Sequence, residues 1–199
     1  MKILAFSDLH RDVEAANALV ASSRSADLVV GCGDYATRGV GAEETLGILV
    51  DCTAPVILVH GNHDNPDDIA RFCGRFSHFH YLHGNAITLN GVSFTGLGGE
   101  VPARSDNDWN ATETETFARE RLAAAGPTTV LVTHTPPLGT ADTQRNGAHE
   151  GSVAIRDAAI ATQPTLLLCG HIHHAWGAEG HIGQTRVKNL GPTANWFDV

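Results

Sequence analysis

Residues 55–64 read PVILVHGNHD, an apolar run that ends abruptly in a cluster of Asn, His and Asp. The run is too short for a helix and is apolar on both faces, which is typical of a strand that is covered on both sides. The polar cluster follows the carboxyl end of that strand. In an open parallel sheet, ligands bind at this edge. The segment therefore predicts a buried strand and a functional loop directly after it.

The same arrangement occurs at four other places in the chain. Outward from residues 55–64, comparable segments are 2–10 (KILAFSDLH), 27–34 (DLVVGCGD), 128–134 (TTVLVTH) and 165–173 (TLLLCGHIH). Each begins with a short stretch rich in Val, Leu or Ile, and Asp or His residues follow it. Since five such clusters at one sheet edge are hard to attribute to chance, we expect their polar side chains to form one site.

Segments with helical character lie between these strands. They span residues 13–23, 43–51, 113–125 and 152–162. Alternating strands and helices imply right-handed crossovers and a largely parallel sheet, so the expected fold class is α/β. Two regions depart from this alternation. Residues 86–96 (AITLNGVSFTG) predict a hairpin with an Asn-Gly turn, and the Gly-rich stretch after His174 can form a second hairpin with 185–189 as one strand, which suggests antiparallel edges and a second sheet.

Length and composition favour one folded domain over residues 1–199, because the chain is too short for two comfortable domains. Acidic residues exceed basic ones, 22 against 13, and the net charge of -9 opposes general attraction to nucleic-acid polymers or anionic membranes. Charged residues follow residue 7 at once, so we expect no signal peptide or membrane span there and a cytoplasmic location. Four cysteines stand singly, which argues against a disulfide framework or a thiolate zinc site: Cys32, Cys52, Cys73 and Cys169.

The five polar clusters contain the ligand types of a divalent-metal site. Carboxylate, imidazole and amide groups suit Mn, Fe, Zn or Mg, and of these we favour Mn. The candidate ligands are Asp8, His10, Asp34, Asn62, His134, His171 and His173. They would crowd a single ion, whereas two ions about 3.5–4 Å apart can share a bridging carboxylate. Asp34 stands alone on its loop and is the natural bridge.

The ordered motifs DLH (8–10), GD (33–34), GNHD (61–64), VTH (132–134) and GHIH (170–173) resemble those of calcineurin-like metallophosphoesterases. The resemblance implies a four-layer αββα sandwich, in which two packed mixed β-sheets are flanked by helices. It implies that Asp8, His10, Asp34 and His173 hold one metal ion. It also implies that Asp34, Asn62, His134 and His171 hold the other.

The same resemblance implies that His63 is the catalytic histidine, paired with Asp64. In two-metal chemistry a hydroxide between the ions attacks phosphorus in line, and the cations offset charge on the phosphoryl oxygens. We expect His63 to protonate the leaving oxygen while Asp64 fixes the tautomer of its ring.

Three further residues are predicted to contact the substrate phosphate: Arg38, His149 and His174. Arg38 could instead close its own loop by an ion pair. His149 lies in the loop over residues 138–151, which together with residues 98–112 is expected to surround the site. Trp109, in the latter loop, either anchors that loop or stacks on a nucleobase.

Small phosphodiesters are the favoured substrate class. The stretch GDYATRG (33–39) lacks the acidic residue that many related phosphatases carry before the Arg, which weakens the protein-phosphatase alternative. HTPPLG (134–139), GHIHHAWG (170–177) and NLGP (189–192) resemble small phosphodiesterases that accept cyclic nucleotides, although less specifically than the metal motifs do. The alternatives are a phosphomonoesterase with the same site, acting on small molecules or proteins, and a non-catalytic scaffold with the same fold.

Overall fold

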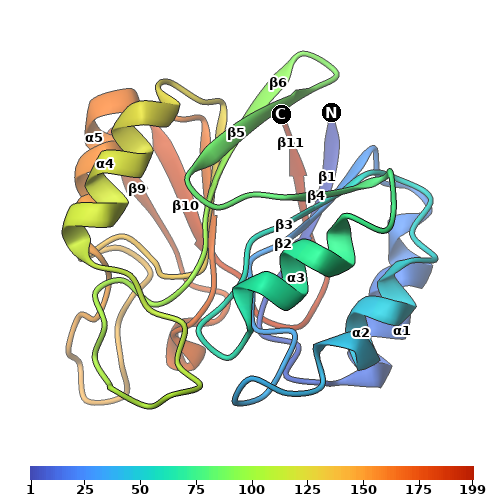
Figure 1. The fold of residues 1–199 in the computed structure, drawn as a ribbon. Coiled ribbons are helices and arrows are strands. Elements are labelled where there is room, and N and C mark those ends of the chain that lie inside the picture. Colours follow the sequence, from blue (N-terminus) through green and yellow to red (C-terminus); the bar gives the residue numbers. More distant parts are fainter.

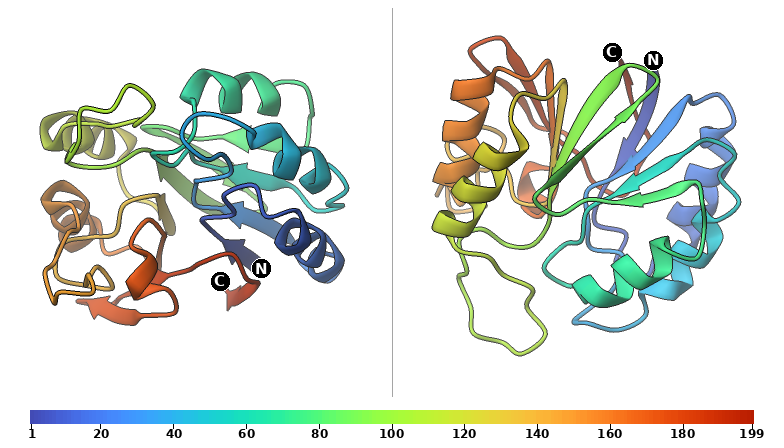
Figure 2. Two further views of the ribbon diagram at one scale, coloured as in Figure 1. Left: turned by 90° about the horizontal axis from the view of Figure 1, so that it is seen from below. Right: turned by 45° about the horizontal axis from the view of Figure 1, so that its top comes forward.

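Two β-sheets pack face to face and carry helices on both outer faces, as Figure 1 and Figure 2 show for the computed structural model, which describes residues 1–199. One sheet has the strand order β11-β1-β2-β3-β4, and the other has the order β5-β6-β7-β8-β10-β9. This arrangement confirms the predicted four-layer sandwich.

The first sheet contains three of the predicted strands, which are parallel and adjacent. They are β1 (Lys2–Phe6), β2 (Leu28–Gly31) and β3 (Val56–Leu58). Two strands that we did not predict complete the sheet: β4 (Phe79–Tyr81) continues the parallel order, and β11 (Asn195–Asp198) pairs antiparallel with β1.

The second sheet contains the other two predicted strands and both predicted hairpins. Its parallel centre consists of β6 (Val92–Leu97), β7 (Val130–Thr133), β8 (Leu166–Cys169) and β10 (Thr185–Asn189). The hairpin partners β5 (Asn85–Leu89) and β9 (Glu179–Ile182) form its antiparallel edges. Both sheets are therefore mixed, as expected.

Three helices cover the first sheet and two cover the second (Figure 1). The first group is α1 (Val13–Ser23), α2 (Ala42–Leu49) and α3 (Pro66–Cys73), and the second is α4 (Glu115–Ala125) and α5 (Val153–Thr162). A short 3-10 helix, η1 (His173–Ala175), follows β8. We did not predict α3, although Asn65 caps it and Pro66 occupies its first turn. No helix is both long enough and apolar enough to cross a bilayer.

Strand β1 shows why these strands are apolar on both faces. Leu4 and Phe6 pack into the cluster between the first sheet and its helices, whereas Ile3 and Ala5 pack into the cluster between the two sheets. Successive side chains of a strand point to opposite faces, so a sheet in the middle of the sandwich must bury both sets.

Phe94 is fully buried in the cluster between the sheets. We expect Phe94→Ala to lower the free energy of unfolding by about 3–5 kcal/mol, because it removes apolar contacts and leaves a cavity. Urea denaturation would measure the change. Ile160→Ala is the control, since Ile160 is 54% exposed on α5 and its truncation should cost about 0.5 kcal/mol or less. Equal losses in the two variants would contradict this account of the core.

Candidate active site and metal centre

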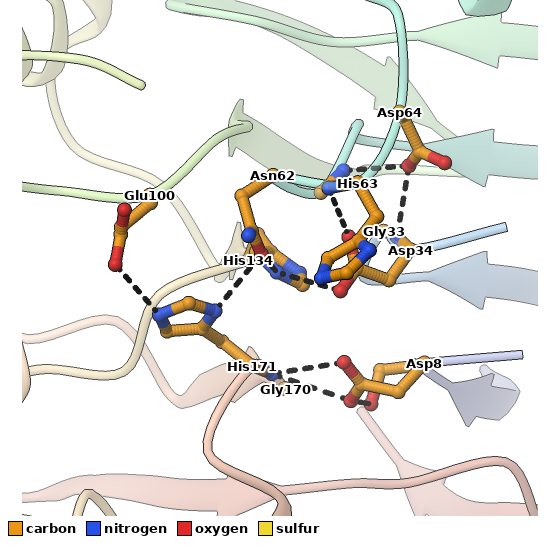
Figure 3. Close-up of polar contacts among 12 residues, drawn as sticks. Asp8, Gly33, Asp34, Asn62, His63, Asp64, Glu100, His134, Gly170 and His171 are labelled. Carbon is orange, nitrogen blue, oxygen red and sulfur yellow. Dashed lines mark hydrogen bonds and ion pairs between the residues drawn. The ribbon is translucent and has the colours of Figure 1, made fainter. Parts of the chain in front are cut away.

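The loops that follow β1, β2, β3, β7 and β8 meet at one edge of the sandwich, where strands of both sheets end (Figure 1, Figure 3). The loops after β1 and β2 are joined by backbone hydrogen bonds, from the Asp8 N–H to the Gly33 carbonyl (2.9 Å) and from the His10 N–H to the Asp34 carbonyl (2.8 Å). This convergence brings all the predicted ligands together in two groups that share Asp34.

The first ligand cluster consists of Asp8, His10, Asp34 and His173. One potential ligand atom from each of these residues lies within 4.8 Å of those of the others. The His10 Nε2 atom is 3.2 Å from His173 Nε2 and 3.4 Å from Asp34 Oδ2. Convergence of two imidazoles and two carboxylates on one point is an arrangement that can bind a divalent cation.

The second ligand cluster consists of Asp34, Asn62, His134 and His171. The Asn62 Oδ1 atom lies 3.0 Å from His134 Nε2 and 3.1 Å from His171 Nδ1. The same Asp34 oxygen that faces His10 is 3.5 Å from His134 Nε2. One carboxylate oxygen therefore adjoins both clusters, which is the geometry of a bridging ligand.

The charge of the site fits cations as well as its geometry does. Asp8 and Asp34 are buried, and their only ion-pair partners are histidines. Burial raises the pKa of Asp34 well above its usual range, and the nearby carboxylates of Asp64 and Asp8 raise it further. No Lys or Arg side chain offsets this buried negative charge, and divalent cations held by the two clusters would do so.

The backbone at the site is held in an uncommon conformation. Asp8, Asp34 and His171 have φ angles of 56°, 59° and 68°, in the left-handed region that residues other than glycine seldom adopt. Close packing around the motif glycines accompanies this strain. A Cβ atom on Gly61 would lie 2.1 Å from Asp34 Oδ1, and one on Gly170 would lie 2.5 Å from Asp8 Oδ2. These glycines are needed because the ligand carboxylates pack directly against their backbone.

His63 lies beside the clusters in a defined tautomer. The Arg38 backbone N–H donates to His63 Nδ1 at 3.1 Å, so the proton of the neutral ring is on Nε2. Partial burial, together with the neighbouring His10, lowers the pKa of His63 to about 4, which keeps the ring neutral at neutral pH. The Trp109 ring packs against it with a centroid distance of 4.7 Å. His63 therefore presents an N–H donor from a ring that is supported on one side by Trp109.

Asp64 does not contact the His63 ring, and the predicted pairing of the two side chains is wrong. Its carboxylate is buried and accepts backbone N–H groups from Gly61 (2.7 Å), Asp34 (2.8 Å) and Ala36 (2.8 Å). Burial raises the pKa of Asp64, and these hydrogen bonds oppose the rise. Asp64 therefore joins the loops after β2 and β3, while the Arg38 N–H fixes the tautomer of His63.

A polar pocket of about 330 Å³ opens over the site. It is lined by Asp34, Asn62, His63, Gln144, His171, His173 and His174. A second pocket of about 420 Å³ adjoins it and shares Gln144 and His174. The structure thus places His174 at the rim of the clusters, where its contact with substrate stays a prediction, together with Gln144, which sequence reasoning did not select.

The other two predicted substrate contacts have different positions. His149 is not among the residues that line the pocket over the clusters, because its Nδ1 lies 2.6 Å from Asp142 Oδ1. Asp142 also accepts the N–H groups of Gly139 and Gly151, so this histidine helps to close its own loop. The Arg38 side chain is exposed and makes no ion pair, so its contact with substrate stays a prediction.

Glu100 belongs to the site and was not predicted. It follows β6, is 7% exposed, and places Oε1 3.5 Å from His171 Nε2 (Figure 3). Burial alone would raise its pKa, but hydrogen bonds from His171 and Asn110 lower the pKa of Glu100 to about 2. The Gly-Gly-Glu sequence at 98–100 carries the signal that could have found it, because it lies directly after a strand at the same sheet edge.

Similarity to known proteins agrees with this geometry. A family model described as calcineurin-like phosphoesterase matches residues 1–175. A probable cyclic nucleotide phosphodiesterase of Synechococcus is 27% identical over 179 residues, which cover 88% of this chain and 68% of the relative.

Two solved structures share the fold. Protein TT1561 of Thermus thermophilus has a TM-score of 0.78 at 18% identity, with 99% of this chain and 98% of that one covered. A structure described as an archaeal phosphodiesterase has a TM-score of 0.56 at 14% identity, with 96% and 84% covered. The match to the family model over most of the chain shows that this protein belongs to the calcineurin-like phosphoesterase family.

Proposed function

We propose that the chain is a phosphodiesterase that requires two divalent metal ions, Mn being favoured, and hydrolyses small phosphodiesters similar to cyclic nucleotides. The observation that carries the proposal is the pair of ligand clusters sharing one Asp34 oxygen. The similarity to a probable cyclic nucleotide phosphodiesterase supports the substrate class.

In this proposal the first ligand cluster would hold one ion and the second ligand cluster would hold the other, and Asp34 belongs to both clusters. When bound, such ions activate water for attack on phosphorus and offset charge on the phosphoryl oxygens. The second cluster also needs a neutral imidazole, and burial supports this because it lowers the pKa of His134 to about 3. Its unprotonated Nε2 faces Asn62 Oδ1, while Nδ1 lies 2.7 Å from the Cys32 carbonyl.

His63 acts on the leaving group in this proposal. Because its Nδ1 accepts the Arg38 N–H, protonation of the ring would cost that hydrogen bond, so the neutral ring donates from Nε2. A hydrogen bond to the leaving oxygen offsets the negative charge that develops there. The prediction was that His63 protonates the leaving oxygen while Asp64 fixes its tautomer; here the ring donates a hydrogen bond, and the Arg38 N–H fixes the tautomer. Arg38 and His174 are the proposed contacts to the remaining phosphoryl oxygens.

The pocket that adjoins the site supports a diester substrate. A phosphodiester carries a second organic group that stays on phosphorus after the leaving group departs, and that group needs space beside the metal centre. The pocket of about 420 Å³ offers this space, since it shares Gln144 and His174 with the pocket over the clusters. A phosphomonoester has no such group and would leave the space unused.

The proposal can be tested with bis-p-nitrophenyl phosphate and p-nitrophenyl phosphate. After dialysis against a chelator we expect no hydrolysis, and added Mn should restore it with a higher kcat/KM for the diester. Mg and Zn should be compared in the same assay, since the ligand set also suits them. Failure of every metal to support turnover would refute the proposal. A higher kcat/KM for the monoester would identify a phosphomonoesterase instead.

A further inference from the structure

A hydrogen-bonded relay of three side chains, Glu100, Asn110 and Asn62, connects the loop after β6 to the second ligand cluster. The Asn62 Nδ2 group donates to Asn110 Oδ1 at 2.8 Å, and the Asn110 Nδ2 group donates to Glu100 Oε2 at 2.8 Å. The other oxygen of Glu100 lies 3.5 Å from His171 Nε2 (Figure 3). One buried carboxylate thus reaches two residues of the second ligand cluster.

The chemistry of these groups gives the relay a direction. A carboxylate can only accept hydrogen bonds, so Asn110 must turn its NH₂ group toward Glu100. Its carbonyl oxygen then faces Asn62, which must donate a hydrogen bond to it from its own NH₂ group. The Asn62 carbonyl oxygen is therefore turned toward His134 and His171, where an amide can serve as a metal ligand. The opposite orientation would present NH₂ to the cation and supply no lone pair.

The same carboxylate orients His171. With the proton on Nε2 facing Glu100, Nδ1 is unprotonated and points to the same place as the Asn62 oxygen. Metal-binding histidines commonly donate their second N–H to a carboxylate, which fixes the ring and its tautomer. Glu100 makes no such contact with Asp8, His10 or His173 of the first ligand cluster.

We propose that Glu100 and Asn110 are positioning residues that set the affinity of the ion held by the second ligand cluster and leave that of the first unchanged. This inference rests on the proposed two-metal site. It gives the loop over residues 98–112 a specific task, because both residues lie in or at the start of that loop. Occupancy of one ion then depends on a loop that contributes no ligand of its own.

The test is a Mn titration of the purified full-length protein, with free Mn followed by electron paramagnetic resonance. We expect two binding sites in the wild type. In Glu100→Gln, either the NH₂ groups at positions 100 and 110 face each other, or the amides of Asn110 and Asn62 rotate so that Asn62 turns its NH₂ group toward the metal site. Asn110→Asp places its carboxylate against that of Glu100. Each single variant should therefore weaken one site by about 10–100-fold, the usual effect of losing an outer-shell partner, and leave the other unchanged.

The double variant Glu100→Gln/Asn110→Asp should restore much of the lost affinity. The amide NH₂ at position 100 can then donate to the carboxylate at 110, whose other oxygen accepts from Asn62, while the amide oxygen at 100 faces His171. Net charge and side-chain volume match the wild type. Two contacts of Arg104 are not restored: its backbone N–H, which lies 3.3 Å from Glu100 Oε2, loses its acceptor, and its guanidinium, which lies 3.7 Å from Glu100 Oε1, faces a neutral amide oxygen. We therefore expect recovery to be incomplete.

Asn146→Asp is the matched control. It makes the same chemical change at an exposed residue of another loop, where the Asn146 side chain accepts only the Ala148 backbone N–H, at 2.9 Å, and a carboxylate oxygen can accept that N–H equally well. Its two Mn affinities should equal those of the wild type.

Three results would each overturn the inference: single variants that bind both ions as tightly as the wild type, single variants that lose both sites equally, or a double variant no tighter than the singles. Fewer than two sites in the wild type would refute it together with the proposed function. The titration needs no substrate. A wild type that binds two ions but hydrolyses no ester would contradict the proposed function alone.

Discussion

Asp34→Asn should lower kcat/KM for the diester by about a thousandfold or more, because metal ions contribute several kcal/mol of charge stabilisation and each 1.36 kcal/mol is tenfold in rate. The lost oxygen charge lies 3.4 Å from His10 Nε2 and 3.5 Å from His134 Nε2, at the junction of the two clusters. Asparagine keeps an oxygen for the His63 backbone N–H, which donates to Asp34 Oδ1 at 2.8 Å, so the loop should stay folded. Steady-state kinetics and metal analysis would measure the effect.

Asp27→Asn is the control for this change. The Asp27 carboxylate accepts the Lys2 N–H at 2.7 Å and takes no part in either cluster. Its variant should keep wild-type kcat/KM and metal content. An Asp34→Asn protein that retains both ions and most of its activity would show that Asp34 is not the bridge.

His63→Phe should lower kcat by about 100–1000-fold for diesters with alkyl leaving groups, the usual cost of removing a hydrogen-bond donor aimed at developing charge. Phenylalanine keeps a ring beside Trp109 but has no N–H. The loss should be much smaller for bis-p-nitrophenyl phosphate, because p-nitrophenolate needs little help to leave. A series of leaving groups of graded pKa would measure this difference.

Metal content and KM should stay near wild type in this variant, since His63 belongs to neither ligand cluster. His181→Phe, on the exposed β9 edge, should behave as wild type throughout. If the loss is the same for every leaving group, then His63 acts elsewhere in the reaction.

Much of the fold follows from local sequence, because strands in the middle of a sandwich must be apolar on both faces and few other segments are. The elements that were not predicted lack that signal. Strand β4 is a three-residue segment, Phe-His-Tyr, with only Phe79 buried. Helix α3 reads PDDIARFC and is only eight residues long. Its buried residues, Ile69, Phe72 and Cys73, span a single turn, which is too short a stretch to establish a helical period, and the helix was missed despite its capping residue.

The candidate ligands could be chosen from sequence because they lie within a few residues of strand ends, where the sheet itself determines their position. The roles of other residues depend on how each loop turns. Adjacent in sequence, His63 and Asp64 point to different surroundings, one to the pocket and one to buried backbone N–H groups. Glu100 acts through Asn110, and no local pattern predicts that a loop will return ten residues later to complete such a contact.

The first ligand cluster joins His10, near one end of the chain, to His173, and 163 positions separate them. During synthesis the residues of the first two loops emerge long before their partners after β8. Because His10 follows a strand of the first sheet and His173 follows a strand of the second, the cluster is complete only once the two sheets have packed together. Assembly of this centre is therefore a late event in folding. Tight metal binding would identify molecules in which the two sheets have already packed together.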